Sequence, residues 1–279
     1  MRPAGQIDPA PRKTPPSRVQ WAFVDLDGTL LRPDQKISHK VVDSVRRLRD
    51  RIPVSIATGR ERLEAIRFAS DLGLTAPQIC DGGAAIFGMP DGQVEWSLPL
   101  GTPTVKAVIT ELQSIGARFF ATHPEGAYTN LLSPDVAELP WVTTDPAAAN
   151  GIEFTRISAL DLSQSCATKL AATLGRQLSL NTARAYLPYN GMWAVDFTHC
   201  DANKGAAATR TAAKAGVKLH NSVAIGDSYN DLPMLRACGL AIAMEGAPRE
   251  VLLAAQHVVP SVHEDGLSTA IEEIVVPLL

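Results

Sequence analysis

The stretch WAFVDLDGTLL, residues Trp21–Leu31, is a run of apolar, strand-forming residues that ends in two aspartates. Gly28 and Thr29 follow directly behind Asp25 and Asp27. A buried carboxylate is costly unless it is paired or bound to a metal, so this strand needs either solvent or a cation at its carboxyl end. A strand followed by an ordinary Asp-Gly turn is the simpler interpretation of the same residues. The choice between the two depends on what the rest of the chain places beside them.

The composition is that of a globular protein. The chain has 279 residues, of which 46% are hydrophobic and 20% are charged, enough for one large domain or two ordinary ones. A net charge of -3 argues against a nucleic-acid or an anionic membrane partner, because both favour basic surfaces. No apolar run is long enough to span a membrane. The cysteines are far apart and predict neither a disulfide framework nor a zinc site.

Residues 1–18 are rich in proline and lack the apolar core of a signal peptide. They predict a disordered N-terminal tail rather than a targeting segment. The expected location of the protein is therefore the cytoplasm.

From Gln20 onward, strand-like apolar runs alternate with helical patterns, which predicts a parallel α/β sheet. Ser38 is placed to cap the first helix, and Gly73 is placed to end the second. The predicted strands of this sheet are WAFVD (21–25), PVSIATGR (53–60), QICDGG (78–83), SVAIGD (222–227) and GLAIAM (239–244).

The alternation stops near Gly83 and resumes at Lys204. The segment between them predicts a hairpin, a helix, the strands ARFFATH (117–123) and IEFTRIS (152–158), a second helix from Leu160 to about Gly175, and two further strands. We therefore expect a parallel core made of residues 19–83 and 200–279, interrupted by an inserted α+β domain at 84–199, which is a normal domain size.

Polar side chains follow several of the predicted parallel strands, where ligand sites of such sheets lie. Oxygen ligands of this kind suit Mg²⁺, especially when a substrate phosphate completes the shell. Lys204 begins a helix after the insertion and can reach the same crevice. A cation, a lysine, a hydroxyl and a free carboxylate are what phosphoryl transfer needs. The polar residues at these strand ends are Asp25, Asp27, Thr58, Asp81 and Asp227.

Four motifs, DLDGTLL, SIATGR, NKG and IGDSYND, occur in the order found in the haloacid dehalogenase-like (HAD) phosphatases, which the chain resembles. The position of the insertion between the second and third motifs resembles the Cof-type branch, as do AIAMEGAPREV and VHEDGLSTAIEEI near the C-terminus. The resemblance implies an α/β fold, with a Rossmann-like parallel-sheet HAD core and an inserted α+β cap domain of type IIB.

The same resemblance implies roles for individual residues. Asp25 would be the nucleophile that forms an aspartyl-phosphate. Asp27 would be the general acid for the leaving alcohol and then the base that activates water. Mg²⁺ would be held by Asp25, by the backbone carbonyl of Asp27 and by Asp227.

The residues that the resemblance implies in binding the phosphoryl group or the substrate are Leu26, Thr58, Gly59, Lys204 and Asn230. Leu26 would contribute its backbone amide, and Thr58 would act with the Gly59 amide. Lys204 would neutralise phosphoryl charge, and Asp231 would orient the lysine. Two interpretations of Asp231 stay open, because an Asp at that place can equally cap the next helix. Arg60 could contact phosphate or substrate, but an arginine at the start of a helix is more often solvated, which is the expectation here.

Asp81 departs from the family pattern, which usually has Asn-Gly where this chain reads CDGGAAI. Its carboxylate would either add an acidic group near the metal or hold the turn into the cap. Several polar and aromatic cap residues could meet a hydroxyl-rich leaving group, although several of them must simply pack the cap: Tyr128, Asn130, Tyr186, Tyr189 and Asn190.

The expected function is Mg²⁺-dependent hydrolysis of small phosphate monoesters, such as sugar phosphates, by a monomer or small homo-oligomer. The partner would be a small phosphorylated metabolite, with no nucleic acid and no membrane. A phosphomutase of the phosphomannomutase type is one alternative. A catalytically idle phosphate-binding regulator is another.

Overall fold

The computed structural model describes residues 14–133, 136, 139–147, 149–187 and 190–279. Most of the predicted tail, residues 1–13, and the cap residue Tyr189 lie outside this set. Among the described helices, none combines the length and the apolar character that crossing a membrane requires.

A five-stranded, fully parallel sheet forms the core of the molecule, in the order β14-β13-β12-β1-β2. Ala22 and Val24 pack into the hydrophobic cluster on one face, while Trp21 and Phe23 pack into the cluster on the other. Because both faces are covered, the four predicted strands of this sheet are buried along their length and mostly apolar, whereas the edge strand β14 is largely exposed and was not predicted. The strands are β1 (Trp21–Val24), β2 (Val54–Ile56), β12 (Ser222–Gly226), β13 (Leu240–Met244) and β14 (His257–Val259).

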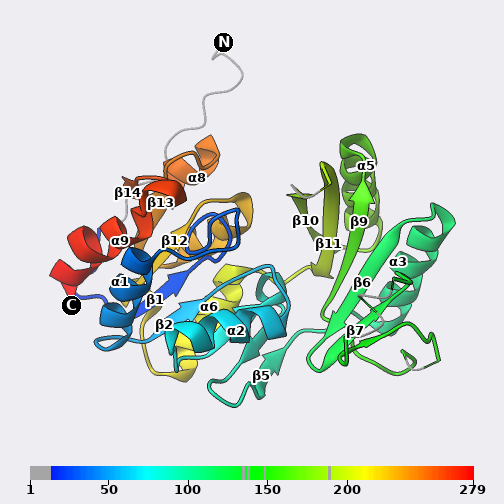
Figure 1. Ribbon diagram of the computed structural model, residues 1–279, viewed down its shortest axis with the longest axis horizontal. Coiled ribbons are helices and arrows are strands. Elements are labelled where there is room, and N and C mark those ends of the chain that lie inside the picture. Colours follow the sequence, from blue (N-terminus) through cyan, green and yellow to red (C-terminus); the bar gives the residue numbers. More distant parts are fainter. Residues whose placement is uncertain (1–13, 134–135, 137–138, 148, 188–189) are drawn as a thin grey trace, which may run out of the picture.

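Helices cover both faces of this sheet (Figure 1). One cluster contains residues of α1 (His39–Arg49), α2 (Arg62–Leu72) and α9 (Gly266–Thr269). The opposite cluster contains residues of α6 (Lys204–Lys214), α7 (Leu232–Ala237) and α8 (Arg249–Ala254). The predicted helix ends are confirmed, since the Ser38 side chain accepts a hydrogen bond from the Val41 amide and Gly73 ends α2 with a φ of 66°.

The hairpin predicted at the start of the insertion is present, and it packs against the core. Strands β4 (Ala85–Phe87) and β5 (Val94–Ser97) form a three-stranded sheet with β3 (Gln78–Cys80). The prediction that QICDGG is a strand of the parallel sheet was therefore wrong, because β3 pairs antiparallel with β4 and meets the parallel sheet through an isolated bridge from Ile79 to Ala57. Ile86 and Trp96 pack with the α6 face of the core. We therefore propose that the inserted domain begins after this hairpin, near Gly101, and not at residue 84.

The remainder of the insertion forms a second, six-stranded sheet in the order β10-β11-β9-β6-β7-β8. Helices α3 (Thr102–Ser114) and α5 (Gln164–Gln177) cover one face of it, and the other face turns toward the parallel core (Figure 1). The strands are β6 (Arg118–His123), β7 (Gly126–Thr129), β8 (Val142–Thr143), β9 (Arg156–Leu162), β10 (Leu180–Leu187) and β11 (Met192–His199).

One predicted helix boundary was wrong. The helix expected from Leu160 begins at Gln164, because Leu160 and Leu162 pair as strand β9 with β6 and β11. Ser163 then caps the helix, and its side chain accepts a hydrogen bond from the Cys166 amide. Pairing with strands on both sides outweighed the helical pattern of the sequence.

Candidate active site

The first and fourth motifs meet at one edge of the parallel sheet. β1 and β12 are neighbours, with Val24 opposite Ile225, so Asp25 and Asp227 follow the same edge. Gly28 has a φ of +82°, and a methyl group there would lie 2.4 Å from the Asp227 carboxylate. Thr29 Oγ1 donates a hydrogen bond of 3.0 Å to Asp227 Oδ1. The Gly-Thr pair therefore does more than turn the chain, because it lets Asp227 approach and holds it.

Lys204 joins the third motif to this edge. Its ammonium is fully buried and donates to Asp25 Oδ1 at 2.5 Å and to Asp231 Oδ1 at 2.6 Å. The other oxygen of Asp231 accepts from the Asp227 and Ser228 amides at 3.0 and 2.9 Å. The Asp231 side chain does not cap α7, so of its two interpretations the geometry favours the lysine partner.

The site is short of positive charge. Burial, and then the nearby Asp231, raise the pKa of Asp25 well above its usual value. The same causes raise the pKa of Asp227 to about 6. Burial lowers the pKa of Lys204, but the carboxylates of Asp231 and Asp25 outweigh it and raise that pKa. Three carboxylates thus face one ammonium.

These carboxylates fit a hard divalent cation. Oxygens of Asp25, Asp227 and Asp231 all lie within 4.8 Å of one another. Both oxygens of Asp231 are already used by Lys204 and by backbone amides. Asp25 and Asp227 are therefore the two side chains with capacity left for a cation, which would supply the charge that the cluster lacks.

The raised pKa of Asp227 predicts a pH-dependent stability of the metal-free protein. The folded state binds more protons than the unfolded state between the usual pKa of 3.8 and about 6, so the free energy of unfolding falls as the pH rises through this window. Asp227→Asn removes this group. Urea unfolding of both proteins in chelator, from pH 4 to pH 7, should show wild type losing up to about 3 kcal/mol relative to the variant. A difference that does not change with pH would contradict the expectation.

The second motif lies beside the fourth. Thr58 is fully buried, and its Oγ1 accepts a hydrogen bond of 3.1 Å from the Arg60 amide, which leaves the hydroxyl proton to donate elsewhere. A methyl group placed on Gly59 would lie 3.9 Å from Asn230 Nδ2, so Asn230 faces this loop. The Leu26 side chain is buried in the core, and only its backbone is available to a phosphate.

Arg60 is not solvated, contrary to the expectation from sequence. Its side chain is 17% exposed, and its guanidinium contacts both oxygens of Asp27, with Nε at 2.8 Å and Nη2 at 2.5 Å. A further bond of 3.0 Å reaches Glu64. The Asp27 side chain is 51% exposed, so the second aspartate of the first motif reaches solvent, whereas the Asp25 side chain is only 6% exposed.

Asp81 lies outside this carboxylate cluster. Its side chain is buried against Thr122, Thr155 and Arg156, all from the inserted domain. Of the two predicted possibilities, the geometry favours a contact with the cap over an added metal ligand.

The predicted cap residues divide into two groups. Tyr128 and Asn130 support the cap itself, because Tyr128 is buried against Phe119 and the Asn130 side chain bonds to backbone atoms of Ala117 and Phe119. Tyr186 is exposed, and Asn190 donates to Asp161. None of these four contacts the carboxylate cluster in an interaction recorded for the described residues.

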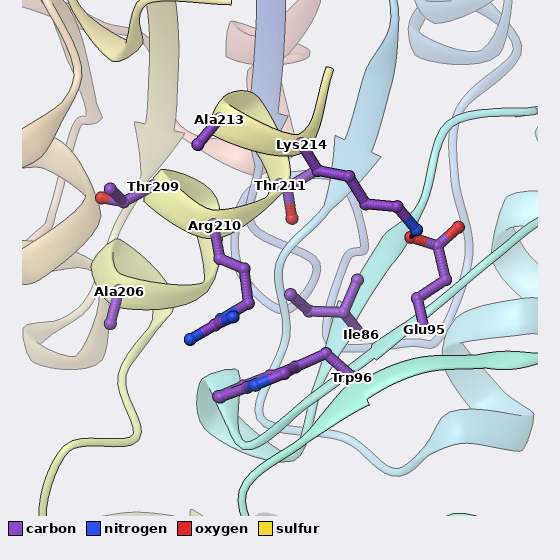
Figure 2. Close-up of a pocket in the computed structure, with 9 residues that line it drawn as sticks. All are labelled: Ile86, Glu95, Trp96, Ala206, Thr209, Arg210, Thr211, Ala213 and Lys214. Atoms are coloured by element: carbon purple, nitrogen blue, oxygen red, sulfur yellow. Dashed lines mark hydrogen bonds and ion pairs between the residues drawn. The ribbon is translucent and has the colours of Figure 1, made fainter. Parts of the chain in front are cut away.

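A pocket of about 540 Å³ lies between α6 and the β4–β5 hairpin (Figure 2). Its walls include the stacked pair of Arg210 and Trp96 and the ion pair of Lys214 and Glu95. None of the predicted site residues lines it, so this pocket is not the candidate active site.

Comparison with known proteins places the chain among hydrolases. The profile of the haloacid dehalogenase-like hydrolase family matches residues 22–271. An HMP-PP phosphatase of Klebsiella pneumoniae is 26% identical over 239 residues, which cover 82% of this chain and 85% of the relative. An HMP-PP phosphatase of an Enterobacter species is 27% identical over 244 residues, covering 86% and 89% of the two chains.

Solved structures agree with the family match. A haloacid dehalogenase-like hydrolase from Bacteroides thetaiotaomicron superposes with a TM-score of 0.79 at 19% identity, covering 92% of this chain and all of that one. A HAD subclass IIB sugar phosphatase superposes with a TM-score of 0.75 at 19% identity, over 94% of this chain and all of that one. The predicted fold class, a parallel α/β core with an inserted cap, is confirmed.

Proposed function

The chain belongs to the haloacid dehalogenase-like hydrolase family, and from that premise we propose that it is a Mg²⁺-dependent phosphatase of small phosphate monoesters. The observation that supports this most is the buried ammonium of Lys204, held between Asp25 and Asp231 at 2.5 and 2.6 Å. Such an ammonium places fixed positive charge beside a carboxylate nucleophile, where a transferring phosphoryl group needs it.

The proposed reaction has two steps. A carboxylate oxygen of Asp25 attacks phosphorus, and the bond from phosphorus to the ester oxygen breaks as Asp27 gives that oxygen a proton, which requires that Asp27 be protonated and released from its ion pair with Arg60. The Asp27 carboxylate then takes a proton from water, whose oxygen attacks the phosphorus of the aspartyl-phosphate. Inorganic phosphate leaves, and the Asp25 carboxylate is restored. Asp25 is buried and Asp27 is half exposed, which suits a nucleophile inside the site and an acid next to a leaving alcohol that departs to solvent.

The remaining residues would bind and orient the phosphoryl group. The Thr58 hydroxyl, the Gly59 amide and the Asn230 side chain would donate hydrogen bonds to its oxygens, and Lys204 would neutralise its charge. Asp25, the Asp27 backbone carbonyl and Asp227 would hold Mg²⁺, which when bound withdraws charge from the phosphoryl oxygens. Thr29 and Gly28 keep Asp227 in place for that role.

The similar proteins support a small phosphorylated metabolite as the substrate. Relatives of similar length are named HMP-PP phosphatase, and one structural neighbour is a sugar phosphatase. We propose that the core binds the phosphate and that the inserted domain selects the rest of the substrate. The cytoplasmic location and the monomeric or small homo-oligomeric state stay predictions.

Phosphate release from a panel of sugar, nucleotide and cofactor phosphates, with and without Mg²⁺, tests this proposal. Asp227→Ala should lower activity and Mg²⁺ affinity together, because it removes one of two free carboxylates. Ca²⁺ should inhibit, since its larger and more flexible shell misplaces the nucleophile. Release in excess chelator at the rate seen with Mg²⁺ would contradict the metal requirement.

The same panel separates the alternatives. A phosphomutase would return the phosphoryl group to a second hydroxyl and release little free phosphate. An idle regulator would bind phosphate esters without turning them over. Equal binding without release across the panel would overturn the proposal.

A further inference from the structure

Asp81 is a carboxylate of the core, and among the described residues its side-chain partners all come from the inserted domain. Asp81 follows β3, is 2% exposed, and has a φ of 49°, in the left-handed region that Asp adopts more readily than most non-glycine residues. Its oxygens accept from Thr155 Oγ1 at 2.6 Å and from Thr122 Oγ1 at 3.2 Å. Arg156 Nε lies 3.4 Å from Asp81 Oδ1. A buried carboxylate is thus stabilised only while the cap lies against the core.

Arg156, the first residue of β9, reaches past Asp81 into the second motif. Its side chain is 11% exposed, and its Nη1 donates to the carbonyl oxygen of Gly59. Burial lowers the pKa of this guanidinium, but the carboxylates of Asp81, Asp196 and Glu61 outweigh it and raise that pKa. This buried guanidinium stays charged, and its Nη1 is held at the Gly59 carbonyl, although its Nε makes an ion pair with Asp81 without a hydrogen bond.

The Gly59 carbonyl belongs to the peptide unit whose N–H is that of Arg60. That N–H donates to Thr58 Oγ1 at 3.1 Å. One rigid peptide plane therefore receives a hydrogen bond from the cap on its oxygen side and gives one to the Thr58 hydroxyl on its nitrogen side. Serial hydrogen bonds of this kind polarise one another. The Thr58 proton is then left to point at the phosphoryl site.

We propose that Arg156, anchored by Asp81, is a positioning residue that makes the orientation of the Thr58 hydroxyl depend on closure of the cap. This inference rests on the proposed phosphatase function. It gives the cap a part in the chemical step, in addition to its proposed part in substrate selection. It also assigns a use to the charge at position 81, because an amide there would leave Arg156 without its nearest recorded buried counter-charge.

The test is a double-mutant cycle that measures kcat with a small aryl phosphate. Such a substrate makes few contacts with the cap, so a change in kcat reports on the chemical step and not on substrate selection. Arg156→Met keeps an unbranched apolar side chain but removes the charge and the donors. We expect it to lower kcat roughly 10- to 100-fold, as small misplacements of catalytic groups do. Thr58→Val should have an effect of the same order. The double variant should lie within about 3-fold of Thr58→Val alone, because both changes act through one hydroxyl.

Arg62→Met is the matched control. Arg62 also crosses from the core to the cap, donating from Nη1 to the Pro124 carbonyl at 2.7 Å, but it has no recorded bond to the Thr58–Gly59 loop. It should leave kcat within about 2-fold of wild type, because its effect is limited to packing. If Arg156→Met fails to fold, Arg156→Lys replaces it. A lysine keeps the charge beside Asp81 but cannot span both partners, so kcat should remain low.

Effects of Arg156→Met and Thr58→Val that multiply, or a kcat for Arg156→Met equal to that of wild type, would overturn the inference. An equal loss in Arg62→Met would also overturn it, since any cap contact would then serve. These outcomes require an active wild type, so they leave the proposed function standing. If wild type itself releases no phosphate, the proposed function fails. Binding of inorganic phosphate then tests the inference, and an unchanged affinity in Arg156→Met would overturn it.

Discussion

Asp25→Asn should reduce phosphate release by on the order of 10⁶-fold, because an amide cannot form the phosphoenzyme. The side chain nearly matches the carboxylate in shape and leaves Lys204 bound to Asp231. Initial rates with the best ester of the panel measure the effect, and the binding of inorganic phosphate shows that the site is still formed. A variant that folds and turns over at a rate comparable to wild type would show that Asp25 is not the nucleophile.

The same substitution should not destabilise the metal-free protein. The pKa of Asp25 is raised by burial and by Asp231 and Asp227, so its ionised form costs the folded state free energy above its usual pKa. A neutral amide removes that cost. We therefore expect the Tm of Asp25→Asn in chelator at pH 7 to equal or exceed that of wild type. A large fall in Tm would mean that activity loss in this variant reports unfolding rather than chemistry.

Lys204→Met should damage both stability and activity. It leaves Asp25 and Asp231 buried without their shared ammonium. Such a change typically lowers the free energy of unfolding by about 3–5 kcal/mol. Loss of the charge on the phosphoryl group should lower kcat by a further factor of roughly 10²–10³. The stability loss should shrink as the pH falls, because protonated carboxylates no longer need the lysine.

Lys214→Met, on the same helix, is the control for this variant. Its ammonium pairs with Glu95 at 2.8 Å but is 65% exposed, and exposed pairs are worth about 0–1 kcal/mol. Urea unfolding of the two variants in parallel separates a buried charge from a surface one. If Lys204→Met unfolds at the same urea concentration as Lys214→Met, the buried array does not stabilise the protein as described.

Sequence patterns predicted the fold well where local signals agree with tertiary packing. The apolar strand at Trp21, the Ser38 cap and the Gly73 stop are each fixed by a few neighbouring residues. The segment at Leu160–Leu162 was mispredicted because its pairing partners lie far away in the chain. The hairpin at Ala85 was assigned to the insertion because its packing on α6 leaves no local mark.

The candidate site shows the same division. Its carboxylates and its lysine stand in motifs with recognisable spacing, and the structure brings Asp25, Asp227, Asp231 and Lys204 together. The bond from Thr29 to Asp227 and the approach of Arg156 to Gly59 join residues more than 90 positions apart. In the sequence, the sign of the contact between Asp81 and Arg156 was the charge of Asp81 at a position where the family usually has Asn.

The central claim is that hydrolysis passes through a phosphoryl group on Asp25. Rapid acid quenching during turnover of a labelled phosphate ester, followed by peptide mapping, tests it most directly. The account predicts label on the peptide that contains Asp25, removable by hydroxylamine as an acyl phosphate is, and none in Asp25→Asn. Label on another residue, or sustained turnover with no label on the protein at any quench time while phosphate is released, would contradict it.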